Sequence, residues 1–301
     1  MSNYHTPVLL QACIDNLNIK PNGVYVDLTF GGGGHSKAIL NCLNDAGKLF
    51  AFDQDIDAHK NKIDDKRFVL IPHNFRYIKN YLRLNGVNKV DGILGDLGVS
   101  SHQFNEASRG FSIRFDAELD MRMNQTDELT AKLIVNTYDE KKLLHLFKFY
   151  GEIDNAFKLT QLIINARQQN SINTTNELIA AIKSCTPKFE DHKYLAKVFQ
   201  ALRLEVNQEL IALEECLTQC TELLVNGGRL VVISYHSLED RIVKNIIKTG
   251  NITGVEQKDI IYGTVKKVYK NLTSKPILPT NEEISINTRA RSAKLRVAEK
   301  I

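Results

Sequence analysis

The sequence predicts an α/β protein in which a mainly parallel sheet is interrupted by a helical insertion. Short apolar runs alternate with helical patterns through the first hundred residues, as they do where helices join parallel strands. One further strand pattern appears only near residue 229, and the intervening residues 98–206 show helical patterns alone. Connections in such folds usually take about 2–6 residues, so an inserted subdomain is expected.

Five strands are predicted from apolar runs, at residues 24–28, 48–53, 67–72, 90–97 and 229–234. Helical spacing predicts helices at residues 34–44, 56–63, 75–84, 129–137, 139–149, 154–169, 174–184, 193–205 and 207–225. Thr174 and Glu177 have the spacing of a capping box, and Asn226-Gly227-Gly228 is expected to end the last helix before the fifth strand. The predicted domains are an α/β domain, residues 1–103 with 207–301, and a helical subdomain, residues 104–206.

The composition is that of a soluble globular protein. Of the 301 residues, 43% are hydrophobic and 25% are charged, which excludes a disordered chain and a disulfide scaffold. No apolar run approaches the ~18–20 residues that span a bilayer, and the first residues lack a signal-peptide pattern, so a cytoplasmic protein without membrane contact is expected. The five cysteines are scattered without zinc-ligand spacing, so no metal is predicted.

Positive charge is concentrated towards the end of the chain. The formal net charge is only +4, but residues 241–301 hold 13 Lys and Arg against 5 Asp and Glu, while residues 1–240 carry a net −4. An anionic partner is therefore expected to bind mainly the C-terminal segment.

A glycine-rich loop follows the first predicted strand. Asp27 lies in that strand, and four consecutive glycines, 31–34, precede the next helix. Glycines allow positive φ angles and a close approach of a ligand, and the helix start offers free N–H groups. Asp53 ends the second strand, where a carboxylate can bind both hydroxyls of a ribose. The pattern predicts a nucleotide-type cofactor; the alternative is a plain turn beside a surface aspartate.

Two cofactors fit such a loop, a dinucleotide and S-adenosylmethionine. Ser36 stands at the third glycine position of a G-x-G-x-x-G pattern counted from Gly31, which disfavours a dinucleotide. The carboxylate of Asp27 would repel a pyrophosphate, yet it can help to bind the ammonium group of a methionine moiety. S-Adenosylmethionine is therefore the predicted cofactor.

Another carboxylate ends the fourth predicted strand. Asp96 lies at the sheet edge where open α/β folds bind ligands. Methyltransferases that act on amino groups of bases often have Asp or Asn, two prolines and an aromatic residue here, and the acidic or amide side chain accepts a hydrogen bond from the amine. This chain keeps only the acid. Methylation of cytosine C5 requires a cysteine nucleophile, and no cysteine lies near the fourth or fifth strand in the sequence. Methylation of an amine is therefore favoured.

Seven segments spread over the chain form a characteristic set. They are YHTPVLL (4–10), TFGGGGHS (29–36), DLGVSS (96–101), RGFS (109–112), LDMRM (119–123), SYHSLEDR (234–241) and RARSAKLR (289–296). In this order they resemble the bacterial 16S ribosomal RNA cytosine-N4 methyltransferase family. The resemblance implies a Rossmann-like class I methyltransferase sheet, with the helical insertion acting in substrate access. It also implies methyl transfer from S-adenosylmethionine to N4 of a cytidine in the decoding region.

The implied partner is 16S ribosomal RNA or the small ribosomal subunit, and the sequence leaves homo-oligomer formation open. The resemblance implies cofactor contacts by Gly33, Gly34, His35, Asp53, Phe75, Asp96 and Gln103. Of these, Asp53 is expected at the ribose and Phe75 at the adenine ring. Asp96 is also the expected catalytic residue, accepting a hydrogen bond from N4 and taking its proton after transfer.

Four residues are predicted to bind the RNA. Tyr235 is expected to stack on the cytosine and His236 to hydrogen-bond the base or a phosphate; the alternatives are core packing for Tyr235 and a structural hydrogen bond for His236. Arg289 and Arg291 fall at alternate positions of an expected strand with one basic face. They are predicted to bind phosphate, and the alternative is a solvated edge strand.

Three other functions stay open at this point. A nicotinamide-dependent oxidoreductase is disfavoured by the missing third glycine. A non-catalytic RNA-binding protein would leave Asp53, Asp96 and the glycine loop without a purpose. A DNA amino-methyltransferase is the nearest rival, because it would use the same chemistry on a different nucleic acid.

Overall fold

The computed structural model describes residues 7–256 and 267–301. The chain forms two compact units, Met1–Gly98 with Leu210–Ile301, and Val99–Glu209. Residues 99–103 and 207–209 thus belong to the second unit, although they were expected in the α/β domain. The first segment of the family resemblance, residues 4–10, lies partly outside the described residues.

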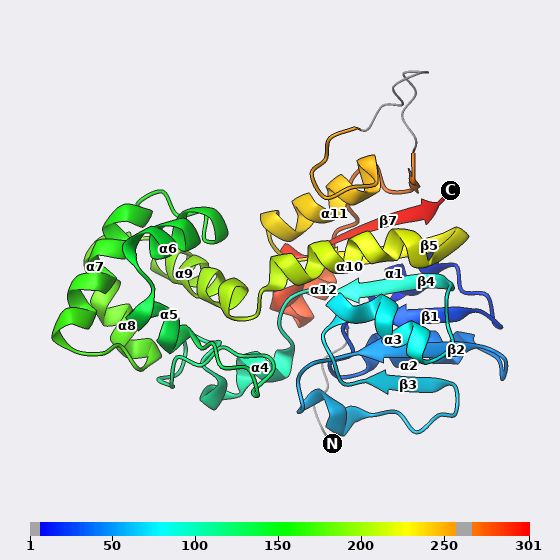
Figure 1. Cartoon of the computed structure of the whole chain (residues 1–301), viewed down its shortest axis with the longest axis horizontal. Helices are drawn as coiled ribbons and strands as arrows, with labels where there is room; N and C mark the ends of the chain where they lie inside the picture. Colours follow the sequence, from blue (N-terminus) through cyan, green and yellow to red (C-terminus); the bar gives the residue numbers. More distant parts are fainter. Residues whose placement is uncertain (1–6, 257–266) are drawn as a thin grey trace. The chain divides into compact units, whose positions relative to one another are not determined.

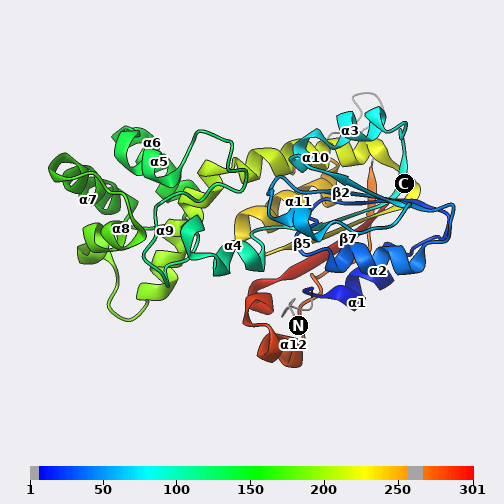
Figure 2. The same ribbon diagram turned by 90° about the horizontal axis from the view of Figure 1, so that it is seen from below.

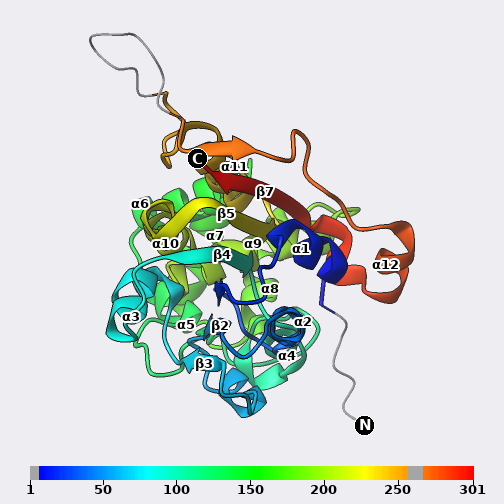
Figure 3. The same cartoon turned by 90° about the vertical axis from the view of Figure 1, so that its right-hand side faces the viewer.

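The first unit contains a seven-stranded sheet in the order β3-β2-β1-β4-β5-β7-β6 (Figures 1 and 3). Its strands are β1 (Val24–Asp27), β2 (Lys48–Phe52), β3 (Phe68–Ile71), β4 (Val90–Asp96), β5 (Leu224–Ser234), β6 (Tyr269–Asn271) and β7 (Lys294–Lys300). Strands β1 to β5 are parallel, and β7 runs antiparallel between β5 and β6. The predicted α/β class is therefore confirmed.

Helices cover both faces of this sheet (Figure 2). They are α1 (Leu10–Leu17), α2 (Gly34–Cys42), α3 (Ile78–Leu84), α10 (Glu209–Leu223) and α11 (Ser237–Thr249), with a short α12 (Asn281–Ile286) near the end of the chain. Helices α1 and α2 share one apolar cluster with the sheet, and α3, α10 and α11 share the other. Because both faces are covered, the central strands are apolar runs, not alternating patterns.

Four predicted elements differ from the structure. The helix expected at 56–63 is a single 3-10 turn, Ala58–Asn61, and the one at 139–149 is α6 (Glu140–His145) followed by a π-helical turn, Leu146–Tyr150. Strand β5 already begins at Leu224, with a register shift against β4, so the glycines lie inside the strand. The expected basic strand begins only at Lys294. The preceding residues form a 3-10 helix, Thr288–Ser292, because the Asn287 side chain caps it.

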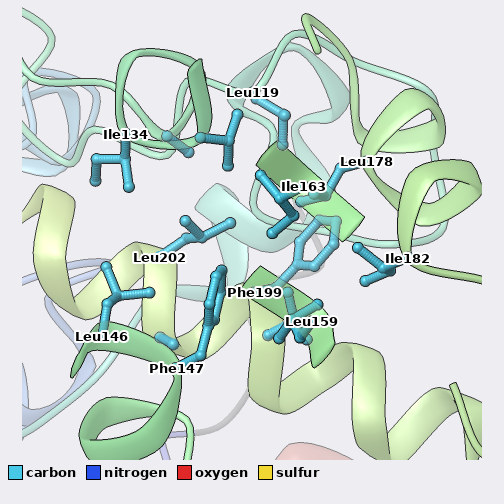
Figure 4. Packing of buried hydrophobic residues seen from close by; sticks show 14 of the residues in the cluster. Leu119, Ile134, Leu146, Phe147, Leu159, Ile163, Leu178, Ile182, Phe199 and Leu202 are labelled. Atoms are coloured by element: carbon cyan, nitrogen blue, oxygen red, sulfur yellow. The ribbon is translucent and has the colours of Figure 1, made fainter. Parts of the chain in front are cut away.

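The second unit is mainly helical around one apolar core. Its helices are α4 (Ser101–Asn105), α5 (Ala131–Thr137), α6, α7 (Ala156–Gln169), α8 (Thr175–Ile182) and α9 (Asp191–Val206). Phe147, Leu159, Phe199 and Leu202 are among the side chains that meet in this core (Figure 4). The capping box at the start of α8 is present as predicted. None of the helices in the described residues has the length and apolar content needed to cross a membrane.

The buried side chain of Asn207 fixes the conformation of residues 119–123. Met121 is buried there with a φ of 62°, an unfavourable angle for a side chain other than glycine. The Asn207 amide oxygen accepts a hydrogen bond from the Met123 N–H at 2.7 Å, and its Nδ2 donates to the carbonyls of Met121 at 2.8 Å and Arg203 at 2.9 Å. Asn207 therefore links this segment to the end of α9.

Replacing Asn207 by Ala should destabilise the second unit. The change removes the hydrogen bonds that Asn207 makes to the Met123 N–H and to the Met121 carbonyl, and the loss of a buried bond of this kind costs about 1–3 kcal/mol. We expect a clearly lower midpoint of urea unfolding, followed by circular dichroism. The control is Asn165→Ala at an exposed position of α7, expected within about 0.5 kcal/mol of the parent. Equal midpoints for the two variants would contradict this role of Asn207.

Candidate functional site

Four functional side chains lie at the carboxyl ends of neighbouring parallel strands. Asp27 ends β1, Asp53 follows β2, Asp96 ends β4 and Tyr235 follows β5. The strand order reverses between β1 and β4, and open α/β sheets bind their ligands beside such a reversal. The sheet thus gathers at one edge residues that lie more than 200 positions apart.

Two carboxylates hold the glycine-rich loop between β1 and α2. Asp27 is buried, and its Oδ2 accepts a hydrogen bond from the Ser36 hydroxyl at 2.6 Å while its Oδ1 accepts one from the Thr29 N–H at 3.0 Å. Asp53 Oδ2 accepts one from the Gly31 N–H at 2.8 Å. Because both Asp27 oxygens accept hydrogen bonds from the loop and from α2, this carboxylate shapes the loop, and its expected contact with an ammonium group stays a prediction.

The loop glycines are required for different reasons. Gly31 has a φ of 50°, and a Cβ there would meet no atom within 4 Å, so the backbone borders open space. Gly33 has a φ of 75° at the N-cap of α2. A Cβ on Gly34 would lie 2.2 Å from Pro7 Cγ, so a side chain has no room there. The backbone at Gly31 is therefore open to a small ligand, whereas Gly33 and Gly34 allow the close packing of the loop and the start of α2.

The environment of Asp53 changes its acidity. Burial raises the pKa of the Asp53 carboxyl to about 6, and the nearby charge of Asp55 adds to this effect. The backbone N–H groups of Asp55 and Gly31 act in the opposite direction because they stabilise the charged form. Asp53 is therefore ionised at neutral pH and loses its charge in mildly acidic solution.

Asp96 is the centre of a second group of contacts. Its Oδ1 accepts a hydrogen bond from the Tyr235 hydroxyl at 2.7 Å, and its Oδ2 lies 3.9 Å from His35 Nδ1. Its backbone N–H donates to the Thr29 hydroxyl at 2.7 Å, which joins the end of β4 to the glycine-rich loop. The structure thus brings together His35, Asp96 and Tyr235, three residues predicted separately from the sequence.

Burial raises the pKa of the Asp96 carboxyl. His35 and the Tyr235 hydroxyl lower this pKa, whereas the negative charges of Asp27 and Glu239 raise it further. The same burial, together with Asp96, raises the pKa of the Tyr235 hydroxyl, which therefore stays protonated and can donate.

The tautomer of His35 follows from its second contact. His35 is buried, and its Nε2 lies 3.1 Å from the carbonyl oxygen of Val8. Because a carbonyl only accepts hydrogen bonds, Nε2 carries the proton. Nδ1 is therefore the ring nitrogen that faces Asp96, at 3.9 Å from its Oδ2.

His236 begins helix α11. Its Nδ1 accepts a hydrogen bond from the Glu239 N–H at 3.4 Å, and the Glu239 carboxylate accepts one from the Tyr235 N–H at 2.8 Å. Glu239 is buried, so these contacts fix the backbone on both sides of His236. The ring thus has the structural role that was the alternative to RNA binding, and its contact with RNA stays a prediction.

The remaining predicted residues lie in different places. Phe75 opens a 3-10 turn after β3, half-buried against the core of the first unit. Gln103 belongs to α4 of the second unit, where its Oε1 accepts a hydrogen bond from the Ser100 N–H at 3.0 Å in a capping box. Arg289 is half-buried and Arg291 exposed, both in the 3-10 helix before β7.

The basic charge of β7 is partly neutralised. Arg296 makes two hydrogen bonds to Asp240 at 2.6 and 3.1 Å, and Lys294 lies 3.9 Å from the same carboxylate. In the described part of the chain, Arg291 pairs with no acidic side chain. Of the expected basic face, Arg291 is therefore the cation most available to a phosphate.

A cysteine lies close to Asp96, contrary to the expectation from the sequence. Cys13 of α1 is fully buried in the cluster that contains Leu94 of β4 and Ile233 of β5. Burial and the negative charge of Asp96 raise the pKa of its thiol far above the usual range. The thiol thus stays neutral and inert, so the exclusion of cysteine-dependent C5 chemistry now rests on burial. No sequence signal shows this proximity, because 83 positions separate the two residues.

The thiols should differ sharply in reactivity. Cys42 is exposed, and the other four cysteines are buried. We expect one thiol of the native protein to react rapidly with Ellman's reagent and all five to react in denaturant. Cys42→Ser should remove the rapid phase, and Cys13→Ser should leave it unchanged. A rapid phase that is lost in Cys13→Ser would contradict the assignment of Cys13 as inert.

Comparisons with known proteins identify the family to which the chain belongs. "Ribosomal RNA small subunit methyltransferase H" of Christiangramia forsetii is 54% identical over 301 residues, covering 100% of this chain and 99% of that protein. The protein of the same name from Flavobacterium psychrophilum is 56% identical over 292 residues, covering 97% of this chain and 100% of its own length. The family model described as the MraW methylase family matches residues 2–301. The chain therefore belongs to the MraW methylase family.

Proposed function

We propose that this chain transfers a methyl group from S-adenosylmethionine to the N4 amine of a cytidine in the decoding region of 16S ribosomal RNA. Membership of a methylase family supports the reaction, and the name of the relatives supports small-subunit ribosomal RNA as the substrate. The observation that carries the choice of an amine is the Asp96 carboxylate, whose Oδ1 is fixed by Tyr235 beside the glycine-rich loop.

The loop fits S-adenosylmethionine. Gly31 borders open space, and the first turn of α2 follows directly, so Gly33, Gly34 and His35 are proposed to bind the methionine end. Asp53 is proposed to accept hydrogen bonds from the ribose hydroxyls. When bound, S-adenosylmethionine supplies an electrophilic methyl group on a positively charged sulfur.

Phe75 and Gln103 are the other proposed cofactor contacts. Phe75 follows β3 on the first unit, and its half-buried ring offers an apolar face to adenine. The proposal for Gln103 rests on the family resemblance of its segment, because the structure uses its carboxamide in the cap of α4.

Asp96 is proposed to activate the acceptor amine by orienting it. The N4 lone pair of cytosine is delocalised into the ring, so the amine is a weak nucleophile until it is aligned. A hydrogen bond from N4–H to the carboxylate would turn the remaining lone pair towards the methyl group, and alignment of this kind contributes about 7–11 kcal/mol in favourable cases. After transfer, N4 carries an extra proton, which Asp96 can accept.

The RNA is proposed to meet two further parts of the chain. The ring of Tyr235 would stack on the inserted cytosine, and His236, Arg289 and Arg291 would contact the base or its flanking phosphates. The second unit, Val99–Glu209, is proposed to control access of the substrate. The substrate would then be this RNA either alone or assembled in the small ribosomal subunit.

Replacing Asp96 by Ala should abolish turnover. We expect the rate with labelled S-adenosylmethionine and small subunits from cells that lack the enzyme to fall about 10²–10⁴-fold or more, because both orientation and the proton acceptor are lost. The matched control is Asp64→Ala, an exposed aspartate of the same unit, which should keep the parent rate. If Asp96→Ala binds cofactor normally and methylates at the parent rate, the assignment of Asp96 is wrong.

The modified nucleotide should be an N4-methylated cytidine. Chromatography of the digested nucleosides against N4- and C5-methylcytidine standards identifies the base atom, and mass spectrometry of ribonuclease fragments identifies the position. We expect a single cytidine in the decoding region. A methyl group on carbon 5 of cytosine or on another base would overturn the proposed function. Methylation of DNA but not of RNA would also overturn it.

Binding of S-adenosylmethionine should weaken in mildly acidic solution. With a pKa of about 6, Asp53 is almost fully ionised at pH 8, and only about one tenth is ionised at pH 5. Since the ionised form accepts hydrogen bonds from the ribose, the dissociation constant measured by calorimetry should rise about tenfold between these pH values and stay level above pH 7.

Asp53→Asn tests the origin of this pH dependence. The variant should bind more weakly at every pH and lose the change between pH 8 and pH 5, because it has no group that titrates at this position. A variant that retains the full pH dependence would assign it to another group and contradict the role of Asp53.

A further inference from the structure

We propose that Tyr235 is a positioning residue for Asp96, in addition to any contact of its ring with the RNA. Its hydroxyl occupies Oδ1 of the Asp96 carboxylate and leaves Oδ2 free for the acceptor amine. This inference rests on the proposed function, because it concerns the group that is to orient N4.

The contacts of the carboxylate single out Tyr235. In the described part of the chain, the Tyr235 hydroxyl is the only hydrogen-bond donor to Asp96, at 2.7 Å from Oδ1. His35 lies on the other side, but its Nδ1 is 3.9 Å from Oδ2, beyond hydrogen-bond distance. Without the tyrosine hydroxyl, the carboxylate could therefore rotate about its Cβ–Cγ bond and exchange its two oxygens.

Tyr235 is itself held from its backbone. Its N–H donates to the buried Glu239 carboxylate at 2.8 Å, and His236 next to it caps α11. Its ring packs against the apolar cluster of β4, β5 and α1. The hydroxyl thus has a defined position from which it can fix Asp96.

Several titratable groups face the carboxylate. They are the carboxylates of Asp27 in β1 and Glu239 in α11, the imidazole of His35 in α2, and the thiol of Cys13 in α1, whose pKa is raised by burial. The negative neighbours and burial favour the protonated form of Asp96, and the Tyr235 hydroxyl opposes them. Loss of this hydroxyl should therefore shift the ionisation of Asp96 to higher pH.

Tyr235→Phe separates positioning from stacking. Phenylalanine keeps an aromatic ring that can stack on a base, and it removes only the hydroxyl. The matched control is Tyr269→Phe, because Tyr269 is buried in the same unit and its hydroxyl has no hydrogen-bond partner among the described residues. Thermal unfolding and calorimetric binding of S-adenosylmethionine verify that both variants are folded.

The rates should be measured with small subunits over the range of pH 5 to 9. For Tyr235→Phe, we expect kcat to fall about ten- to a hundredfold and the acid limb of the kcat profile to move to higher pH, with KM for the subunit nearly unchanged. Tyr269→Phe should retain the parent profile. If the pH profile of Tyr235→Phe coincides with that of the parent, the positioning role is overturned.

The failure of this inference differs from a failure of the proposed function. If the parent protein forms no N4-methylcytidine, the proposed function itself is wrong. If the parent is active and Tyr235→Phe raises only KM for the subunit while the pH profile is unchanged, Tyr235 acts through its ring, and the inference alone is overturned. Asp96→Asn, which has no titratable carboxyl, should lack the acid limb in either tyrosine background.

Discussion

The buried carboxylate of Asp27 is the constraint on which the candidate site depends. It binds both the start of the glycine-rich loop, through the Thr29 N–H, and the first turn of α2, through the Ser36 hydroxyl. Thr29 in turn accepts the N–H of Asp96. The end of β1, the loop and the end of β4 thus form one hydrogen-bonded unit, and a buried anion is retained because its partners satisfy both oxygens.

Much of the fold could be predicted from local sequence patterns. Strands β1 to β4 were expected within one or two residues of their observed ends, because they are apolar runs bounded by polar or glycine residues. The 3-10 turn at Ala58–Asn61 and the late start of β7 were not expected. Tertiary contacts override local propensity at the turn, and the Asn287 cap does so before β7. The spacing of glycines and of Asp53 indicated the loop, because that information lies within 25 residues.

The contacts between distant residues could not be predicted in this way. The Tyr235–Asp96 hydrogen bond joins residues 139 positions apart, and Cys13 approaches Asp96 only because α1 packs on β4 and β5. Asp96 and Tyr235 were both expected at the same sheet edge. No local pattern, however, shows that the Tyr235 hydroxyl donates a hydrogen bond to the Asp96 carboxylate. Asp27 shows the same limit, because a strand-end carboxylate has the same sequence signature whether it faces a ligand or the protein.

The contacts of His35 have a consequence for the order in which the protein is completed during synthesis. Its Nε2 is bound by the carbonyl of Val8, and the neighbouring Leu9 N–H donates to Glu283 at 2.7 Å. A segment that supports the glycine-rich loop is thus held by a residue that lies 274 positions later in the chain. Because a ribosome adds about 5–20 residues per second, the segment around Val8 and Leu9 gains its full set of contacts only many seconds after it is made.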